Sequence, residues 1–223
     1  MKINKLHSWN LSYSNAREMQ KEFAKLVISS SEAINPRLIA GVDVSSNRFS
    51  TKGIAAVVVL DYPGLNVIEV ELEETELPIP YIPGLLSFRE CPIILAACAR
   101  LRHTPDLFMV DGQGIAHPRR LGLASHLGLF LDVPSIGCAK SILCGNYEYL
   151  REEAGSCSEL IDKGEVVGAA LRTKRKTKPV YVSIGHKIDI ASALYWVKEC
   201  CCGYRLPQPT RLAHMAAGGS LIF

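Results

Sequence analysis

LIAGVDV at residues 38–44 and LFMVD at residues 107–111 indicate how this chain folds. Each is a short apolar run that ends at or beside an aspartate, which is typical of a buried strand that reaches the edge of its sheet. If the two strands are parallel neighbours, Asp43 and Asp111 converge at the carboxyl ends of the strands, where open α/β sheets bind their ligands. The ordinary alternative is that both aspartates serve turns at the strand ends.

The sequence around these two stretches predicts the remaining elements. Short connections predict an antiparallel meander of three strands at 38–44, 53–60 and 67–73. A helix at 87–102 then leads to the strand at 107–110, and such a crossover makes that strand parallel to an earlier one. Further runs predict strands at 135–138, 166–171 and 180–184, and helices at 15–29, 120–130, 188–199 and 209–217.

Length and composition point to one globular domain. The chain has 223 residues, of which 48% are hydrophobic and 21% charged, so disordered and fibrous classes are excluded. The element order predicts a single α/β domain over residues 1–223, in which a mixed sheet of three antiparallel strands followed by parallel strands is flanked by helices. No apolar run approaches the ~20 residues that span a bilayer, and the first ten residues lack the apolar segment of a secretory signal. We therefore expect a cytoplasmic protein that does not bind membranes.

Charge and cysteine content say little about partners. The net charge of +3 is small, but residues 172–178, RTKRKTK, carry five positive charges in seven positions. Such a run suits phosphate binding and equally suits a solvated loop. The eight cysteines include no CxxC pair, so reduced thiols are expected. The run Cys200–Cys202 does not by itself make a zinc site, because neighbours in sequence cannot supply four tetrahedral ligands.

Carboxylates that meet at one sheet edge repel each other unless a shared proton, a basic partner or a divalent cation compensates their charge. Mg²⁺ prefers oxygen ligands, and two such ions ~3.5–4 Å apart can clamp both sides of a phosphodiester displacement. Glu90, on the helix between the two strands, is the candidate for a third acid beside Asp43 and Asp111. The alternative is that Ser87 and Glu90 form a capping box at the start of this helix.

Other polar residues offer chemistry, each with a structural alternative. His214, on the predicted C-terminal helix, can orient or deprotonate a water, or it is simply structural. Lys140, after a short strand, can pair with a phosphate or stay solvated. The glycine-rich stretch DGQGIAHPRRLGLASHLG at 111–128 allows either close approach to a flat ligand or close helix packing. Within it, Arg119 and Arg120 can bind phosphates, or they simply lie at a helix N-terminus that is exposed to water.

Six segments form a pattern more specific than any short motif: GVDVS (41–45), PYIPGLLSFRE (80–90), DGQGIAHPRRLGLASHLG (111–128), IGCAKS (136–141), KPVYVSIGH (178–186) and PTRLAH (209–214). In this order, from Gly41 to His214, the chain resembles the endonuclease V family. The resemblance implies a ribonuclease H-like fold and the repair of DNA that contains deoxyinosine. It also implies Mg²⁺-dependent hydrolysis, with Mn²⁺ as a substitute, of the second phosphodiester on the 3′ side of the lesion, leaving 3′-hydroxyl and 5′-phosphate ends.

The same resemblance implies a role for each matching residue. It assigns metal binding to Asp43, Glu90 and Asp111, with Lys140 and His214 completing the catalytic set. It assigns the wedge that pushes between base pairs to Tyr81, Ile82 and Pro83. It assigns the base pocket to Gly84, Leu86, Gly112, Gly114, His117 and Gly122. Such a wedge can fill the space left by an extruded base while fixed amides and carbonyls read the base edge. Hypoxanthine and adenine exchange donor and acceptor at N1 and position 6, so such a pocket rejects adenine.

Three rival functions and two departures accompany this hypothesis. The rivals are an endonuclease for inosine-containing RNA, a noncatalytic lesion-binding module that keeps the pocket, and a small-molecule enzyme. The small-molecule enzyme has no support from a dinucleotide motif, since GxGxxG is absent from the glycine-rich stretch. The departures are Ile184, where the family usually has proline, and Cys200–Cys202, which belong to no motif of the family. We expect the protein to be a monomer.

Overall fold

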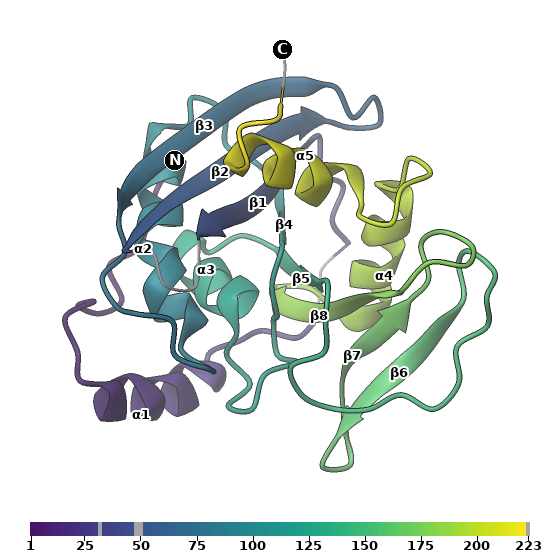
Figure 1. Cartoon of the computed structure of the whole chain (residues 1–223), viewed down its shortest axis with the longest axis horizontal. Coiled ribbons are helices and arrows are strands. Elements are labelled where there is room, and N and C mark those ends of the chain that lie inside the picture. Colours follow the sequence, from purple (N-terminus) through teal and green to yellow (C-terminus); the bar gives the residue numbers. More distant parts are fainter. Residues whose placement is uncertain (31–32, 47–50, 222–223) are drawn as a thin grey trace.

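The computed structural model describes residues 1–30, 33–46 and 51–221, and within them the chain forms one eight-stranded sheet (Figure 1). The strands lie in the order β3-β2-β1-β4-β5-β8-β7-β6. Their bounds are β1 Leu38–Ser46, β2 Lys52–Asp61, β3 Val67–Glu76, β4 Leu107–Val110, β5 Ser135–Ala139, β6 Cys157–Asp162, β7 Glu165–Leu171 and β8 Val180–His186. The predicted α/β class with a mixed sheet is confirmed.

Strand directions follow the prediction in one half of the sheet and depart from it in the other. β1, β2 and β3 form the expected antiparallel meander, and β4 and β5 add in parallel. β8, β7 and β6 then pair antiparallel, so the expected parallel run ends at β5. β6 was not predicted. It forms a hairpin with β7 through Lys163 and Gly164, which both have positive φ, as a tight two-residue hairpin turn requires.

Five helices within the described residues complete the domain: α1 Tyr13–Ala24, α2 Leu86–Arg100, α3 Leu123–Leu131, α4 Ile190–Glu199 and α5 Gln208–Ala217. α1 begins earlier than predicted because the Ser12 hydroxyl accepts a hydrogen bond from the Asn15 backbone N–H at 3.1 Å and so caps the helix. None of these helices has both the length and the apolar character that crossing a bilayer requires.

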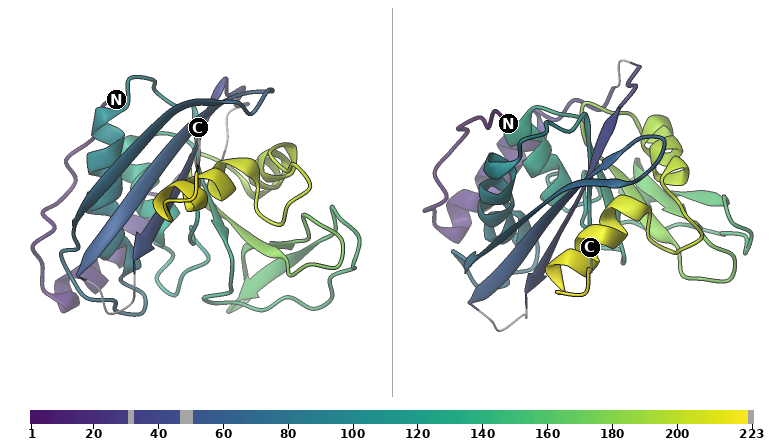
Figure 2. Two further views of the ribbon diagram at one scale, coloured as in Figure 1. Left: turned by 45° about the horizontal axis from the view of Figure 1, so that its top comes forward. Right: turned by 90° about the horizontal axis from the view of Figure 1, so that it is seen from above.

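The sheet is covered on both faces, as Figures 1 and 2 show. In β2, Val57 and Val59 pack toward α2 and α3, whereas Val58 and Leu60 pack toward α5. α4 covers the same side as α5, farther along the sheet, against β5, β7 and β8. Because each fully buried aliphatic side chain contributes about 1.5–3 kcal/mol, a strand such as β2 that is apolar on both faces stabilises the packing of helices against both sides of the sheet.

Candidate active site

The parallel pairing of β1 with β4 brings two aspartates together. Val42 is in register with Val110, and the Asp111 backbone N–H donates to the Val42 carbonyl at 2.9 Å. Asp43 and Asp111 follow these two valines directly, so they lie side by side where β4 ends and its pairing with β1 stops. Since side chains alternate along a strand and Val42 faces α2, Asp43 points toward α5.

α5 adds His214 to this edge. The His214 Nδ1 lies 2.7 Å from Asp43 Oδ2. The helix can approach so closely because of Gly41, where a Cβ atom would lie only 1.9 Å from the Pro209 carbonyl oxygen. One ligand atom from each of Asp43, Asp111 and His214 falls within 4.8 Å of the others, which is close enough for one cation to contact all three.

Lys140 enters from the strand on the other side of β4. It follows β5 directly, and its amine forms an ion pair with Asp111 Oδ2. The same amine lies 3.2 Å from His214 Nδ1. Because a carboxylate is the stronger hydrogen-bond acceptor, we assign the Nδ1 proton of His214 to the bond with Asp43, which leaves Nε2 as an acceptor. The His214 side chain is 56% exposed, so this atom is open to solvent.

Glu90 approaches from the opposite side of the sheet, on α2. It lies in the interior of that helix, whose N-cap is Leu85, so the capping-box alternative is wrong. Ser87 instead contacts the Nδ1 of the buried His126 at 3.0 Å. Burial and the neighbouring charges of Asp43 and Asp111 raise the pKa of Glu90 to about 8. Glu90 is not one of the three residues whose ligand atoms lie within 4.8 Å of one another, but the charges of both aspartates act on its carboxyl.

The electrostatics of these acids fit a divalent cation. Burial, and then the charge of Asp43, raise the pKa of Asp111, even though Lys140 opposes the shift. The raised pKa values of Glu90 and Asp111 show that the cluster has too little positive charge to balance its carboxylates. The ammonium of Lys140 alone does not compensate them. Carboxylate oxygens with one imidazole nitrogen are donors that hard and borderline divalent ions accept. The donor set and its charge therefore suit a metal site.

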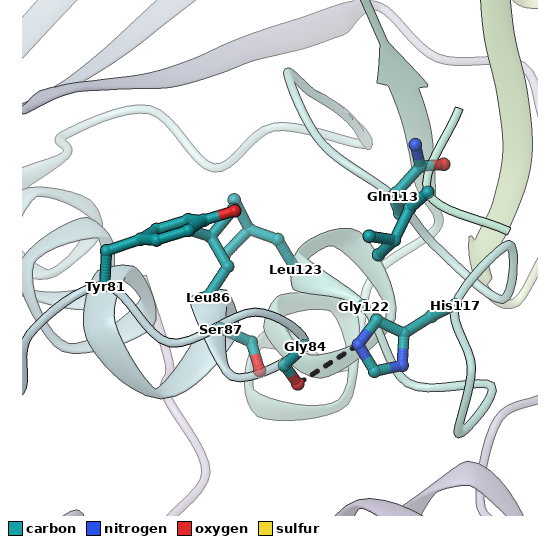
Figure 3. A pocket seen from close by; sticks show the side chains of 9 residues that line it. Tyr81, Gly84, Leu86, Ser87, Gln113, His117, Gly122 and Leu123 are labelled. Atoms are coloured by element: carbon teal, nitrogen blue, oxygen red, sulfur yellow. Dashed lines mark hydrogen bonds between the residues drawn. The ribbon is translucent and has the colours of Figure 1, made fainter. Parts of the chain in front are cut away.

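A cavity of about 70 Å³ lies between the loop that precedes α2, the first turn of that helix and the segment that follows Asp111. Its walls combine apolar side chains with a few polar groups: Tyr81, Gly84, Leu86, Ser87, Gln113, His117, Gly122, Leu123 and Leu143. Figure 3 shows Tyr81 and Leu86 on one side of the cavity and His117 and Gln113 on the other. The predicted pocket residues Gly84, Leu86, His117 and Gly122 thus line one cavity, whereas Gly112 and Gly114 are not among its lining residues.

Packing accounts for Gly114. A Cβ atom there would lie 1.9 Å from the Ile184 carbonyl oxygen, so the glycine permits close contact with β8. At Gly112 a Cβ would meet the Leu123 side chain at 3.2 Å. Of the two explanations left open for the glycine-rich stretch, close packing applies to Gly114, and Gly122 serves both the packing and the cavity.

The segment that contains Tyr81, Ile82 and Pro83 is anchored at Gly84. The Gly84 carbonyl accepts hydrogen bonds from Gln20 Nε2 at 3.0 Å, Arg119 Nη2 at 2.6 Å and His117 Nε2 at 3.2 Å, the last of which is dashed in Figure 3. Burial, with a smaller effect of the Arg119 charge, lowers the pKa of His117 to about 4, so the imidazole is neutral at pH 7. Tyr81, three residues before the anchored Gly84, is 39% exposed.

The two arginines proposed for phosphates are engaged inside the protein. Arg119 also donates from Nε to Gln20 Oε1, and Arg120 pairs with Asp162 and Glu165, both at 2.8 Å. Both side chains therefore hold the fold together.

The basic run 172–178 joins β7 to β8, as predicted. Arg172 turns inward and donates to main-chain carbonyls, including that of Arg151 at 2.6 Å. Lys174, Arg175 and Lys176 are exposed and form the cationic part of the loop.

The sequence interpretation missed Gln113. Its Nε2 donates to the Ser141 carbonyl at 2.8 Å, which fixes the amide orientation, and its buried Oε1 has no partner within the described residues. A signal was available, because Gln113 stands two residues after Asp111 in a stretch of small residues, where a long polar side chain is unusual. Leu123 and Leu143 also line the cavity, but no sequence pattern distinguishes them from core leucines.

Comparisons with known proteins place the chain in one family. The family model described as Endonuclease V matches residues 21–215. The Endonuclease V of Dehalococcoides mccartyi is 52% identical over 217 residues, which cover 97% of each chain. The crystal structure of Endonuclease V from Bacillus subtilis has a TM-score of 0.92 at 31% identity and covers 98% of this chain and 96% of its own. That of Ciona intestinalis Endonuclease V, in complex with a 24mer DNA containing an inosine followed by a ribo-adenosine, has a TM-score of 0.79 at 26% identity over 92% and 96%.

The architecture and the site lead to one assignment. The sheet, with its antiparallel meander, two parallel additions and flanking helices, is ribonuclease H-like, as in these nucleases. Asp43 and Asp111 meet at the edge of the sheet where open α/β folds bind their ligands. The chain belongs to the endonuclease V family of metal-dependent nucleases.

Proposed function

We propose that this protein cuts DNA that contains deoxyinosine, at the second phosphodiester on the 3′ side of the lesion, and leaves 3′-hydroxyl and 5′-phosphate ends. The observation that carries the proposal is the meeting of Asp43, Asp111, His214 and Lys140 at one edge of the sheet, in a fold that also holds the cavity lined by Tyr81. The inosine-containing DNA bound by the Ciona relative supports the choice of lesion. In this proposal the protein acts as a monomer on cytoplasmic DNA.

Asp43, Glu90 and Asp111 would hold Mg²⁺, or Mn²⁺ in its place. Bound there, the metal would polarise the scissile phosphate and neutralise the charge that develops on it. Lys140 keeps its ammonium at Asp111 and so supplies a second positive charge at the reacting phosphate. His214, oriented by Asp43, presents Nε2 to solvent and accepts a proton from the attacking water.

Lesion recognition falls to the loop and cavity beside the acids. Tyr81, Ile82 and Pro83 form an aromatic and proline edge that can replace an extruded base in the stack, and the Gly84 anchor keeps this edge in place. The cavity then receives the base. Gln113 lines this cavity, and its buried Oε1, which has no hydrogen-bond partner among the described residues, is in this proposal the acceptor for a donor on the base, such as the N1–H of hypoxanthine.

The test is a nicking assay on a duplex with one deoxyinosine. The native protein should cut it in Mg²⁺ and not in EDTA, and should leave an undamaged duplex intact. Asp111→Ala should lower the cutting rate by about 10³-fold or more, because it removes a central ligand and the partner of Lys140. Glu22→Ala, which removes an exposed carboxylate on α1 that pairs with Lys25, is the control and should cut normally. Full activity of Asp111→Ala would refute the assignment.

Two further arms separate the alternatives. The Ciona complex contains a ribo-adenosine after the inosine, so matched strands with deoxyribose or ribose at that position measure which sugar this protein prefers. Faster cutting of the ribose strand would favour the endoribonuclease. Binding of inosine DNA without cutting under any divalent cation would favour the noncatalytic module.

A further inference from the structure

Lys140 lies beyond the part of the sheet that would hold its main chain. The last paired residue of β5 is Ala139, opposite Tyr181 on β8, and Lys140 follows it. Its side chain is flexible, with four rotatable bonds, and yet its ammonium contacts Asp111. Because the ladder ends one residue earlier, the position of the amine depends on other groups that fix the backbone here.

Arg205 supplies such a contact. It lies between α4 and α5, and its Nη2 donates to the Lys140 carbonyl at 2.6 Å and to the Pro179 carbonyl at 2.8 Å. Its Nε donates to the Lys178 carbonyl at 2.9 Å. Its own carbonyl accepts a hydrogen bond from the Thr173 hydroxyl. One guanidinium thus joins the end of β5 to the residues just before β8, and its rigid planar fork of donors suits such a set of carbonyls better than the flexible point charge of an ammonium.

A second anchor holds the next residue from the other side. Gln113, two residues after Asp111, donates to the Ser141 carbonyl at 2.8 Å. The consecutive carbonyls of Lys140 and Ser141 are therefore each held by a side chain from a different segment. This arrangement limits rotation of the backbone that carries the amine.

We propose that Arg205 is a positioning residue for Lys140: by holding the Lys140 main chain against the start of β8, it keeps the ammonium on Asp111, where the phosphate reacts. Arg205 acts through Lys140 and does not contact the reacting atoms itself. The proposal rests on the catalytic role of Lys140 in the proposed function, and its test separates the two.

The test compares Arg205→Ala with Arg172→Ala. Arg172 is the matched control because it also ties carbonyls of this region together, at Arg151 and Thr177, but makes no hydrogen bond to Lys140. With an excess of protein over inosine duplex, Arg205→Ala should lower the single-turnover rate by about 10- to 100-fold, the cost of misplacing a reacting group by about 1 Å. Its dissociation constant for the duplex should stay within about twofold of the native value, as should both constants of Arg172→Ala.

A double-mutant cycle shows whether Arg205 acts through Lys140. In the Lys140→Ala background, Arg205→Ala should change the rate by no more than about twofold, because the group that it positions is gone. Equal losses in both backgrounds would overturn the proposal, and so would an equal loss in Arg172→Ala. Arg205→Lys should recover only part of the rate, since the donors of an ammonium radiate from one atom on a flexible stem and do not reproduce the rigid fork that reaches the three carbonyls.

A second measurement does not depend on cutting. The rate at which an amine-reactive acylating reagent modifies Lys140, followed by mass spectrometry of the peptide, should rise several-fold in Arg205→Ala and stay unchanged in Arg172→Ala. An unchanged rate in Arg205→Ala overturns the positioning role. If that rate rises while Lys140→Ala cuts normally, the positioning role stands and the catalytic role given to Lys140 fails.

Discussion

Glu90 shows most clearly how a single residue trades stability for function. Its carboxyl is buried beside Asp43 and Asp111, and its pKa of about 8 lies far above the ordinary value of 4.5. In the absence of a metal, the folded protein must therefore take up a proton that the unfolded chain releases. A site prepared for a cation is strained without it, because the same charges that attract the ion repel one another.

Glu90→Gln should therefore stabilise the metal-free protein while it destroys activity. The amide needs no proton, so we expect the free energy of unfolding at pH 8 in EDTA to rise by roughly 2–4 kcal/mol. Urea denaturation measures this change. Glu74→Gln, at an exposed position of β3, is the control and should have no such effect. A less stable Glu90→Gln protein at pH 8 would contradict the charge repulsion described here.

At the scale of elements, the contact between β1 and α5 decides whether the site forms. Asp43 and His214 lie far apart along the chain. They meet because Gly41 has no side chain, which lets the start of α5 approach the backbone of β1. The close approach is backbone against backbone, at Pro209, so a side chain at residue 41 cannot be accommodated by rotamer changes.

Gly41→Ala should displace α5. We expect the free energy of unfolding to fall by about 1–3 kcal/mol, and cutting of inosine DNA to be lost, because His214 moves away from Asp43. Gly53→Ala, on β2, is the matched control, since the nearest atoms to a Cβ there belong to the Leu77 side chain, at 3.0 Å, and not to the backbone. Denaturant titration and the nicking assay measure both effects. Native activity in Gly41→Ala would mean that α5 can shift without moving His214.

For the whole molecule, buried titratable groups oppose one another across the pH range. Burial is the main cause that lowers the pKa of four histidines: His7, His117, His126 and His186. Below about pH 6.5 the unfolded chain binds protons on them that the folded state refuses, so stability is lost as the pH falls. Glu90 and Asp111 have raised pKa values and act in the opposite sense, so that stability is lost as the pH rises toward the pKa of Glu90, about 8.

The metal-free protein should therefore be most stable near pH 7. Between pH 7 and 5 the destabilising effect of the four histidines should exceed the stabilising effect of Glu90 and Asp111. We therefore expect the free energy of unfolding to fall by roughly 2–4 kcal/mol over this range. Between pH 7 and 8 a smaller loss should appear, and Mg²⁺ should remove it by binding the ionised acids. Urea titrations from pH 5 to 9, with and without Mg²⁺, measure the loss of stability on both sides of pH 7. A flat profile would contradict this balance.

The sequence by itself determined most strands and helices, the carboxyl-end placement of Asp43 and Asp111, and the family, because these depend on apolar periodicity and on residue order. It did not determine that β8 returns antiparallel, that Ser12 caps an α1 that begins at Tyr13, or that β6 exists. Local patterns do not specify strand direction, and a side-chain cap or a tight turn outweighs periodicity. Tertiary structure alone decided that Arg119 anchors Gly84, that Gln113 faces the cavity and that Arg205 holds Lys140. Each of these contacts joins segments far apart along the chain, and only close packing brings them within hydrogen-bonding distance.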